Sequence, residues 1–144
     1  MKADATRRFV LDASVALAWF IDPSVAPLAA RIQRLLLQGD RAIVPQLWPA
    51  EIANGFVMAE KRGTLSAARI AQAFAELDLL LTKSIENVGH ALSIQRIVAI
   101  AQNFGLTAYD AIYLETAREQ RLPLATLDRK LAAAAGQAGV PLIS

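Results

Sequence analysis

The chain has 144 residues, of which 55% are hydrophobic, and it carries a formal net charge of +2 with no cysteine. The absence of cysteine excludes disulfides, thiolate nucleophiles and cysteine-based zinc sites, and it agrees with a reducing compartment. The small positive charge favours a polyanionic partner only weakly. A chain of this length predicts one domain over residues 1–144, with a core large enough to need no structural metal.

The segment Phe9–Phe20 reads FVLDASVALAWF and follows several basic residues, an order that is also typical of a secretory signal. Asp12 interrupts this apolar run. The uncharged part from Ala13 to Ile21 is shorter than the roughly 20 residues that span a membrane. We therefore expect no signal segment and no membrane partner, and we place the protein in the cytoplasm.

Short apolar runs alternate with longer helical patterns along the whole chain. In chain order, the pattern predicts a strand over 8–11, helices over 14–21 and 26–38, a strand over 41–45, helices over 48–62 and 66–81, a short edge strand over 83–88, helices over 90–104 and 108–121, a strand over 122–126, a helix over 128–135 and a last strand over 140–143. Gly39 and Gly105 are typical helix stops, and Ser66 and Thr107 are typical caps. This alternation predicts an α/β fold with three layers, in which about seven helices flank a five-stranded, mainly parallel sheet.

Four acidic residues stand where a strand ends or a helix begins: Asp12, Glu51, Asp110 and Asp128. Each of them taken alone reads as a helix cap or as a charge that suits the positive end of a helix. Taken together they should meet at one edge of the sheet, because the carboxyl ends of parallel strands share that edge. Like charges so close repel, and a hard divalent cation such as Mg²⁺ or Mn²⁺ relieves the repulsion. Such a site can activate water for attack on a phosphodiester.

Four segments of the chain resemble the motif blocks of the PIN-domain family: FVLDASVALAWF, VPQLWPAEIAN, LTAYDAIYLETA and LPLATLDRKL. More narrowly, they are similar to those of VapC-type toxins of bacterial toxin–antitoxin pairs. The blocks occur in the family's order and span nearly the whole chain. The resemblance implies a PIN-like fold and an Mg²⁺-dependent endoribonuclease, with Mn²⁺ as a substitute metal. It also implies an RNA substrate, a cognate antitoxin protein and a homodimer.

The resemblance also assigns residues to a site. The family's catalytic acids fall on the following positions: Asp12, Glu51, Asp110 and Asp128. Of these, Asp12, Asp110 and Asp128 are expected to hold the metal, directly or through water. Glu51 is expected to bind the metal through water, or to orient and deprotonate the attacking water. Three further positions match polar residues of the family and are expected to support the site: Ser14, Asn54 and Thr126.

Several other residues have a functional and a structural interpretation. Arg129 and Lys130 could contact RNA phosphates or belong to a solvated helix face. Tyr109 and Tyr113 are one helical turn apart, which favours packing but allows base stacking. His90 is the only histidine and favours a surface or capping role, because one histidine supplies neither a triad nor a zinc site.

The sequence leaves three alternatives open. A phosphoryl-transfer or receiver protein would fit poorly, because the first strand is followed by Asp-x-Ser rather than Asp-x-Asp, and the last strand carries no lysine. A non-catalytic PIN-like module could bind RNA or act as a scaffold, although such members would be expected to lose acids. A PIN nuclease outside toxin–antitoxin systems would keep them. The RNA target, the number of metals and the antitoxin do not follow from the sequence.

Overall fold

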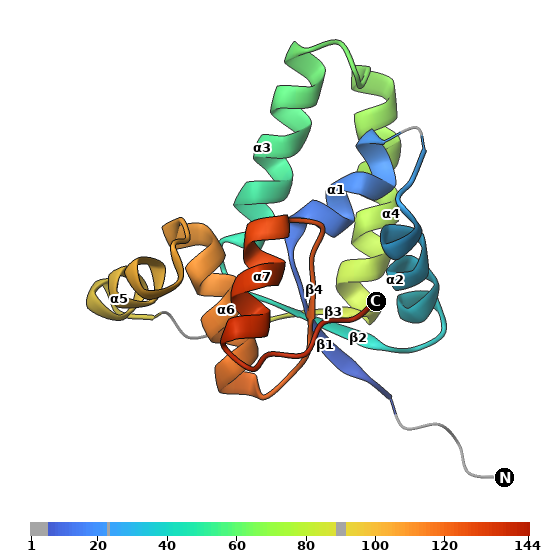
Figure 1. Cartoon of the computed structure of the whole chain (residues 1–144). Helices are drawn as coiled ribbons and strands as arrows, with labels where there is room; N and C mark the ends of the chain where they lie inside the picture. Colours follow the sequence, from blue (N-terminus) through green and yellow to red (C-terminus); the bar gives the residue numbers. More distant parts are fainter. Residues whose placement is uncertain (1–5, 23, 89–91) are drawn as a thin grey trace, which may run out of the picture.

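The computed structural model describes residues 6–22, 24–88 and 92–144. Within them the chain forms four strands and seven helices (Figure 1). In chain order these are β1 (Arg8–Leu11), α1 (Ala13–Ile21), α2 (Pro27–Leu37), β2 (Arg41–Val44), α3 (Trp48–Lys61), α4 (Ala67–Lys83), β3 (Ile85–Asn87), α5 (Ile94–Phe104), α6 (Ala108–Gln120), β4 (Leu124–Ala125) and α7 (Arg129–Gln137). The expected α/β fold class is confirmed.

The four strands form one parallel sheet in the order β3-β2-β1-β4. Phe9, Val10 and Leu11 of β1 are all fully buried, although successive strand residues point to opposite faces. Both faces of β1 are therefore covered, as is usual for a parallel sheet. Figure 1 shows α5, α6 and α7 on one side of the sheet and α2 and α4 on the other, which gives the three expected layers.

The fifth strand that the sequence predicts over 140–143 is not formed as a strand. Leu142 makes only an isolated parallel bridge to Leu124 of β4. Pro141 accepts a hydrogen bond from the Leu124 amide but has no N–H of its own to continue a ladder. The segment therefore lies beside β4 without becoming part of the four-stranded sheet.

One predicted helix begins later than expected. The sequence predicts a helix over 90–104, whereas α5 begins at Ile94, because the Ser93 side chain caps it by accepting a hydrogen bond from the Arg96 amide. His90 and the start of the predicted helix lie outside the described residues. In the part of the chain that the structure describes, no helix combines the length and the apolar character needed to cross a bilayer.

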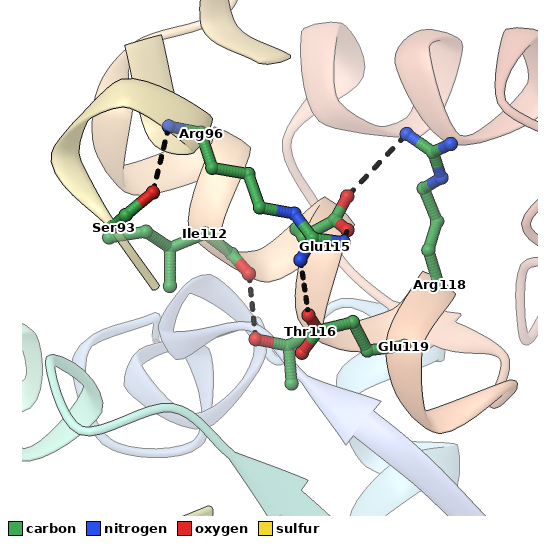
Figure 2. Close-up of polar contacts among 7 residues, drawn as sticks. All are labelled: Ser93, Arg96, Ile112, Glu115, Thr116, Arg118 and Glu119. Carbon is green, nitrogen blue, oxygen red and sulfur yellow. Dashed lines mark hydrogen bonds and ion pairs between the residues drawn. The ribbon is translucent and has the colours of Figure 1, made fainter. Parts of the chain in front are cut away.

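A buried acid joins α5 to α6 (Figure 2). Glu115 on α6 is 3% exposed, and its Oε1 accepts a hydrogen bond from the Arg96 guanidinium of α5. Its Oε2 has no hydrogen bond within the described residues, but lies 3.5 Å from an Arg118 guanidinium nitrogen. Arg96 also forms a 3.0 Å ion pair with Glu119. The negative charge of the buried Glu115 carboxylate is thus balanced by two arginines at the α5–α6 contact.

Helices α1 and α3 pack closely at a glycine. A Cβ atom placed on Gly55 of α3 would lie 2.5 Å from Leu17 Cδ2 of α1, which is closer than carbon atoms approach without movement. The absence of a side chain at Gly55 thus lets the two helix backbones approach. The two helices carry acidic residues near this contact, since Glu51 stands one turn before Gly55 on α3 and α1 begins directly after Asp12.

Candidate active site

The site lies where the strand order of the sheet reverses. The chain runs from β1 outward to β2 and β3, and then returns to place β4 on the other side of β1. In open α/β sheets, ligands bind outside the carboxyl ends of the strands at such a switch point. The carboxyl ends of β1 and β4 are aligned here, since Leu11 pairs with Ala125 and the Asp12 amide donates a 3.0 Å hydrogen bond to the Ala125 carbonyl.

Asp12 is buried and held by two hydroxyl groups. It is 5% exposed, and its Oδ2 accepts hydrogen bonds from Ser14 Oγ at 2.7 Å and from Thr126 Oγ1 at 2.6 Å. Ser14 Oγ accepts the Leu127 N–H, and Thr126 Oγ1 accepts the Asp128 N–H, so each hydroxyl proton is directed to Asp12. Both donors use the same carboxylate oxygen, and Oδ1 accepts no side-chain hydrogen bond from the described residues.

The environment of Asp12 disfavours its charge. Burial raises the pKa of the Asp12 carboxyl, the Thr126 and Ser14 hydroxyls oppose the shift, and the charge of Asp128 adds to it. Asp12 occupies the N-cap position of α1, where the Ser14 backbone N–H lowers the pKa of its carboxyl, though less than either hydroxyl does. The capping interpretation of Asp12 therefore accounts for only part of its surroundings.

Glu51 lies in the first turn of α3 and is half-buried. Its Oε1 accepts a 2.6 Å hydrogen bond from the Tyr113 hydroxyl of α6. Burial raises the pKa of Glu51, the Tyr113 hydrogen bond lowers it, and the charges of Asp12 and Asp110 raise it further. The negative charges of two other acids thus act on Glu51, while the Tyr113 hydroxyl donates a hydrogen bond to one of its carboxylate oxygens.

Asp110 lies in the first turn of α6, where Thr107 caps the helix by accepting a 3.2 Å hydrogen bond from the Asp110 amide. Burial, followed by the charges of Asp128 and Asp12, raises the pKa of Asp110 to about 6. The effect of the neighbouring acids exceeds that of Thr107, which acts in the opposite direction.

Asp128 does serve as a cap. Its Oδ1 accepts a 2.9 Å hydrogen bond from the Leu131 amide at the start of α7. Its charge nevertheless raises the pKa of both Asp12 and Asp110, so it belongs to the same electrostatic group. Capping and participation in the acidic site are compatible for this residue.

The four acids form a mutually repelling group that suits a hard cation. Within the described residues, none of them makes an ion pair with a lysine or arginine. No three acidic or histidine side chains in that part of the chain are arranged to hold one metal ion directly. Mg²⁺ usually keeps several waters and binds one or two carboxylates, so this donor set fits it through water as well as through direct contact.

The other residues that the sequence singles out differ in exposure and in their contacts. Arg129 and Lys130 are exposed in the first turn of α7, directly after Asp128. Asn54 is exposed on α3, and no hydrogen bond joins it to the acids in the described residues. Tyr113 is fully buried, so no base can stack on it, whereas Tyr109 is 62% exposed.

Two contacts could not have been found in the sequence. The hydrogen bond from Tyr113 to Glu51 joins residues 62 positions apart, and the buried charge of Glu115 depends on how α5 packs on α6. Helical periodicity places Tyr113 and Asp110 on one face of α6, which is the only signal that links this tyrosine to the site.

The structure thus defines a parallel α/β domain with four acidic residues grouped at the topological switch point of its sheet. The family model described as PIN domain matches residues 9–137, and the chain belongs to this family. No curated protein matches the sequence.

Solved structures show the same fold. The chain is 23% identical to PAE2754 from Pyrobaculum aerophilum, with a TM-score of 0.67 over 90% of this chain and 87% of the other. It is 19% identical to FitAcB from Neisseria gonorrhoeae, with a TM-score of 0.64 over 94% and 96%. It is 25% identical to a chain of a toxin–antitoxin complex from Klebsiella pneumoniae, with a TM-score of 0.53 over 87% and 90%.

Proposed function

We propose that the chain is a metal-dependent endoribonuclease that acts as the toxin of a type II toxin–antitoxin pair in the cytoplasm. The observation that carries the proposal is the environment of the Asp12 carboxylate. Its buried carboxylate has two hydroxyl donors, makes no ion pair with a lysine or arginine of the described residues, and lies in the field of Asp128. A buried charge of this kind costs several kcal/mol unless it is paired or binds a cation.

The acids take different roles in this proposal. Asp12, Asp110 and Asp128 hold Mg²⁺, or Mn²⁺ in its place, directly or through water. Glu51 binds the same ion through water or orients and deprotonates the attacking water. When bound, the ion neutralises the acids and the negative charge that develops on the phosphodiester.

The remaining polar residues support this site. Ser14 and Thr126 keep the Asp12 carboxylate in one orientation, which their paired hydrogen bonds to Oδ2 favour. Arg129 and Lys130 are exposed beside Asp128 and attract RNA phosphates. Asn54 is exposed one turn after Glu51 and is proposed as a further residue that supports the site.

An antitoxin partner is favoured by an apolar groove between α3 and α4. The groove has a volume of about 390 Å³, and its lining includes Ile52, Phe56, Phe74 and Leu81. Phe74 is 54% exposed and Leu81 is 43% exposed. Exposed apolar patches of this kind commonly mark sites where an amphipathic segment of a partner binds. Because a toxin–antitoxin complex is among the similar structures, an antitoxin is the partner to test. We also propose that the chain forms a homodimer.

The nuclease proposal is tested with total RNA incubated with the wild-type chain in Mg²⁺, in Mn²⁺ and in EDTA. We expect cleavage with either metal, no cleavage in EDTA, and none with Asp12→Asn. Glu60→Gln removes an exposed acid near the end of α3, away from the apolar groove, and it should cleave like the wild type. Full cleavage by Asp12→Asn would refute the proposal.

Two outcomes separate the alternatives. A chain that binds RNA but neither binds Mg²⁺ nor cleaves would be a non-catalytic PIN-like module. A chain that cleaves RNA but is not inhibited by any protein encoded beside it would be a PIN nuclease outside toxin–antitoxin systems. Inhibition by a small co-expressed neighbour, measured on the same RNA, supports the toxin assignment.

A further inference from the structure

Tyr113 is placed to control one of the four acids. Its hydroxyl donates a 2.6 Å hydrogen bond to Glu51 Oε1, and the tyrosine side chain is fully buried. Burial, followed by the hydrogen bond to Glu51 and its charge, raises the pKa of Tyr113 above its ordinary value. A tyrosine hydroxyl, whose ordinary pKa is about 10, is protonated at neutral pH, and here its proton is directed to Glu51.

Glu51 needs such a donor to stay near the other acids. The charges of Asp12 and Asp110 both act on it, and like charges push a flexible side chain outward to water. Within the described residues, the Tyr113 hydroxyl is the hydrogen-bond donor to the Glu51 side chain. The restraint is made across two helices, because Glu51 belongs to α3 and Tyr113 to α6.

The same helix also carries Asp110, three residues before Tyr113. Residues three apart on a helix lie on one face, so α6 presents an acid and the donor to another acid toward the same region. A shift of α6 would move both together. Tyr113 thus fixes the position of Glu51 relative to Asp110, although the two acids come from different helices.

We propose that Tyr113 is a positioning residue for RNA cleavage. Its hydroxyl holds the Glu51 carboxylate toward the other acids by one oxygen and leaves Oε2 to act on the attacking water. This inference rests on the proposed nuclease function, in which Glu51 orients or deprotonates that water. It assigns no direct contact between Tyr113 and the RNA or the metal.

Tyr113→Phe tests the inference, because it removes the hydroxyl and keeps the buried ring. At saturating RNA and Mg²⁺ we expect kcat to fall at least about tenfold. A catalytic group that is misplaced by about 1 Å can lower the reaction rate by up to about a hundredfold. The KM for RNA should stay within about twofold, because Tyr113 is buried away from the RNA. Thr116→Val removes another buried hydroxyl of α6, one that donates to the Ile112 carbonyl, so it is the matched control and should leave kcat unchanged.

A structural role is distinguished by repeating the change in the Glu51→Gln background. If Tyr113 acts through the Glu51 carboxylate, Tyr113→Phe should cause no further loss of the residual activity there. A kcat of Tyr113→Phe within about twofold of the wild type overturns the inference, and so does an equal loss in both backgrounds.

Glu51→Asp is a second variant that does not disturb the buried ring. It keeps the charge but shortens the side chain by one methylene, so the carboxylate no longer reaches Tyr113. We expect a comparable loss of kcat, and wild-type activity in this variant would also overturn the inference. A wild-type chain that does not cleave RNA would instead overturn the proposed function, whereas wild-type cleavage by Tyr113→Phe overturns this inference alone.

Discussion

Thr126 and Asp12 lie 114 positions apart in the chain, yet Thr126 Oγ1 donates a 2.6 Å hydrogen bond to Asp12 Oδ2. This bond joins the segments that follow β4 and β1, the two strands at the topological switch. Because Thr126 Oγ1 also accepts the Asp128 amide, one hydroxyl connects two of the four acids. The Thr126 side chain therefore connects the acids that follow the two paired strands.

Thr126→Val removes this hydroxyl at nearly constant volume. It leaves the Asp12 carboxylate with one hydroxyl donor and the Asp128 amide without its acceptor. We expect the free energy of unfolding to fall by about 1–3 kcal/mol, the usual cost of leaving buried polar groups unpaired. Urea denaturation at pH 7.5 measures it. Thr126→Ser keeps the hydroxyl, so its free energy of unfolding should fall clearly less. An equal decrease in both variants would contradict this account.

Asp12→Asn should separate stability from activity. In EDTA at neutral pH it removes a buried charge that burial and Asp128 disfavour, while its amide oxygen can still accept the two hydroxyls. We expect the metal-free variant to be at least as stable as the wild type in urea denaturation. Saturating Mg²⁺ should then stabilise the wild type, by about 2.7 kcal/mol at a hundred times Kd, and the variant much less. The same Mg²⁺ gain in both chains would argue against a metal at Asp12.

The free energy of unfolding of the metal-free protein should depend on pH through Asp110. Its pKa in the folded protein is about 6, above the ordinary value of 3.8. The folded protein therefore binds more protons than the unfolded chain between these values, so stability falls as pH rises from about 4 to above 6. Urea denaturation in EDTA across this range checks the slope. Asp110→Asn should flatten it, and a slope unchanged by that variant would contradict the assignment.

The acids could be predicted from the sequence because their positions follow from topology. A parallel sheet brings the carboxyl ends of its strands to one edge, and Asp12 and Asp128 follow apolar runs that read clearly as strands. Side-chain partners do not follow from such patterns. No pattern in the sequence distinguishes Glu115 from the other acids of the chain, and only the packing of α5 against α6 shows that it is buried beside Arg96.

The missing fifth strand has a similar origin. An apolar run such as 140–143 indicates extended backbone, but ladder formation depends on hydrogen bonds that Pro141 cannot donate. The start of α5 depends on which of several polar residues caps the helix, and Ser93 does so here. Sequence patterns therefore located the elements of this fold better than their ends.

The buried ion pair between α5 and α6 makes a prediction about stability. Arg96→Met removes the main partner of Glu115 and leaves its carboxylate 3.5 Å from Arg118. We expect the free energy of unfolding to fall by at least about 1 kcal/mol, but by less than the roughly 3–5 kcal/mol typical of fully buried pairs, because the Arg96 side chain is 52% exposed. Thermal or urea denaturation measures the loss.

Two further variants test the cause of that loss. Arg8→Met breaks an ion pair with Glu86 in which both side chains are exposed, and it should cost less than about 1 kcal/mol. Glu115→Gln in the Arg96→Met background removes the unbalanced charge and should recover part of the stability. If Arg8→Met lowers the free energy of unfolding as much as Arg96→Met does, the burial of Glu115 does not explain the loss in Arg96→Met.

The close approach of α1 and α3 gives the last prediction. Gly55→Ala should gain about 1 kcal/mol from helix propensity, but its Cβ meets Leu17 Cδ2 at 2.5 Å and overpacking typically costs about 1–3 kcal/mol. We therefore expect Gly55→Ala to be neutral or destabilising in the wild-type chain, and stabilising when Leu17 is first changed to alanine. Urea denaturation of the two single variants and the double variant measures this coupling. Additive effects would show that Leu17 does not limit the approach of the helix that carries Glu51.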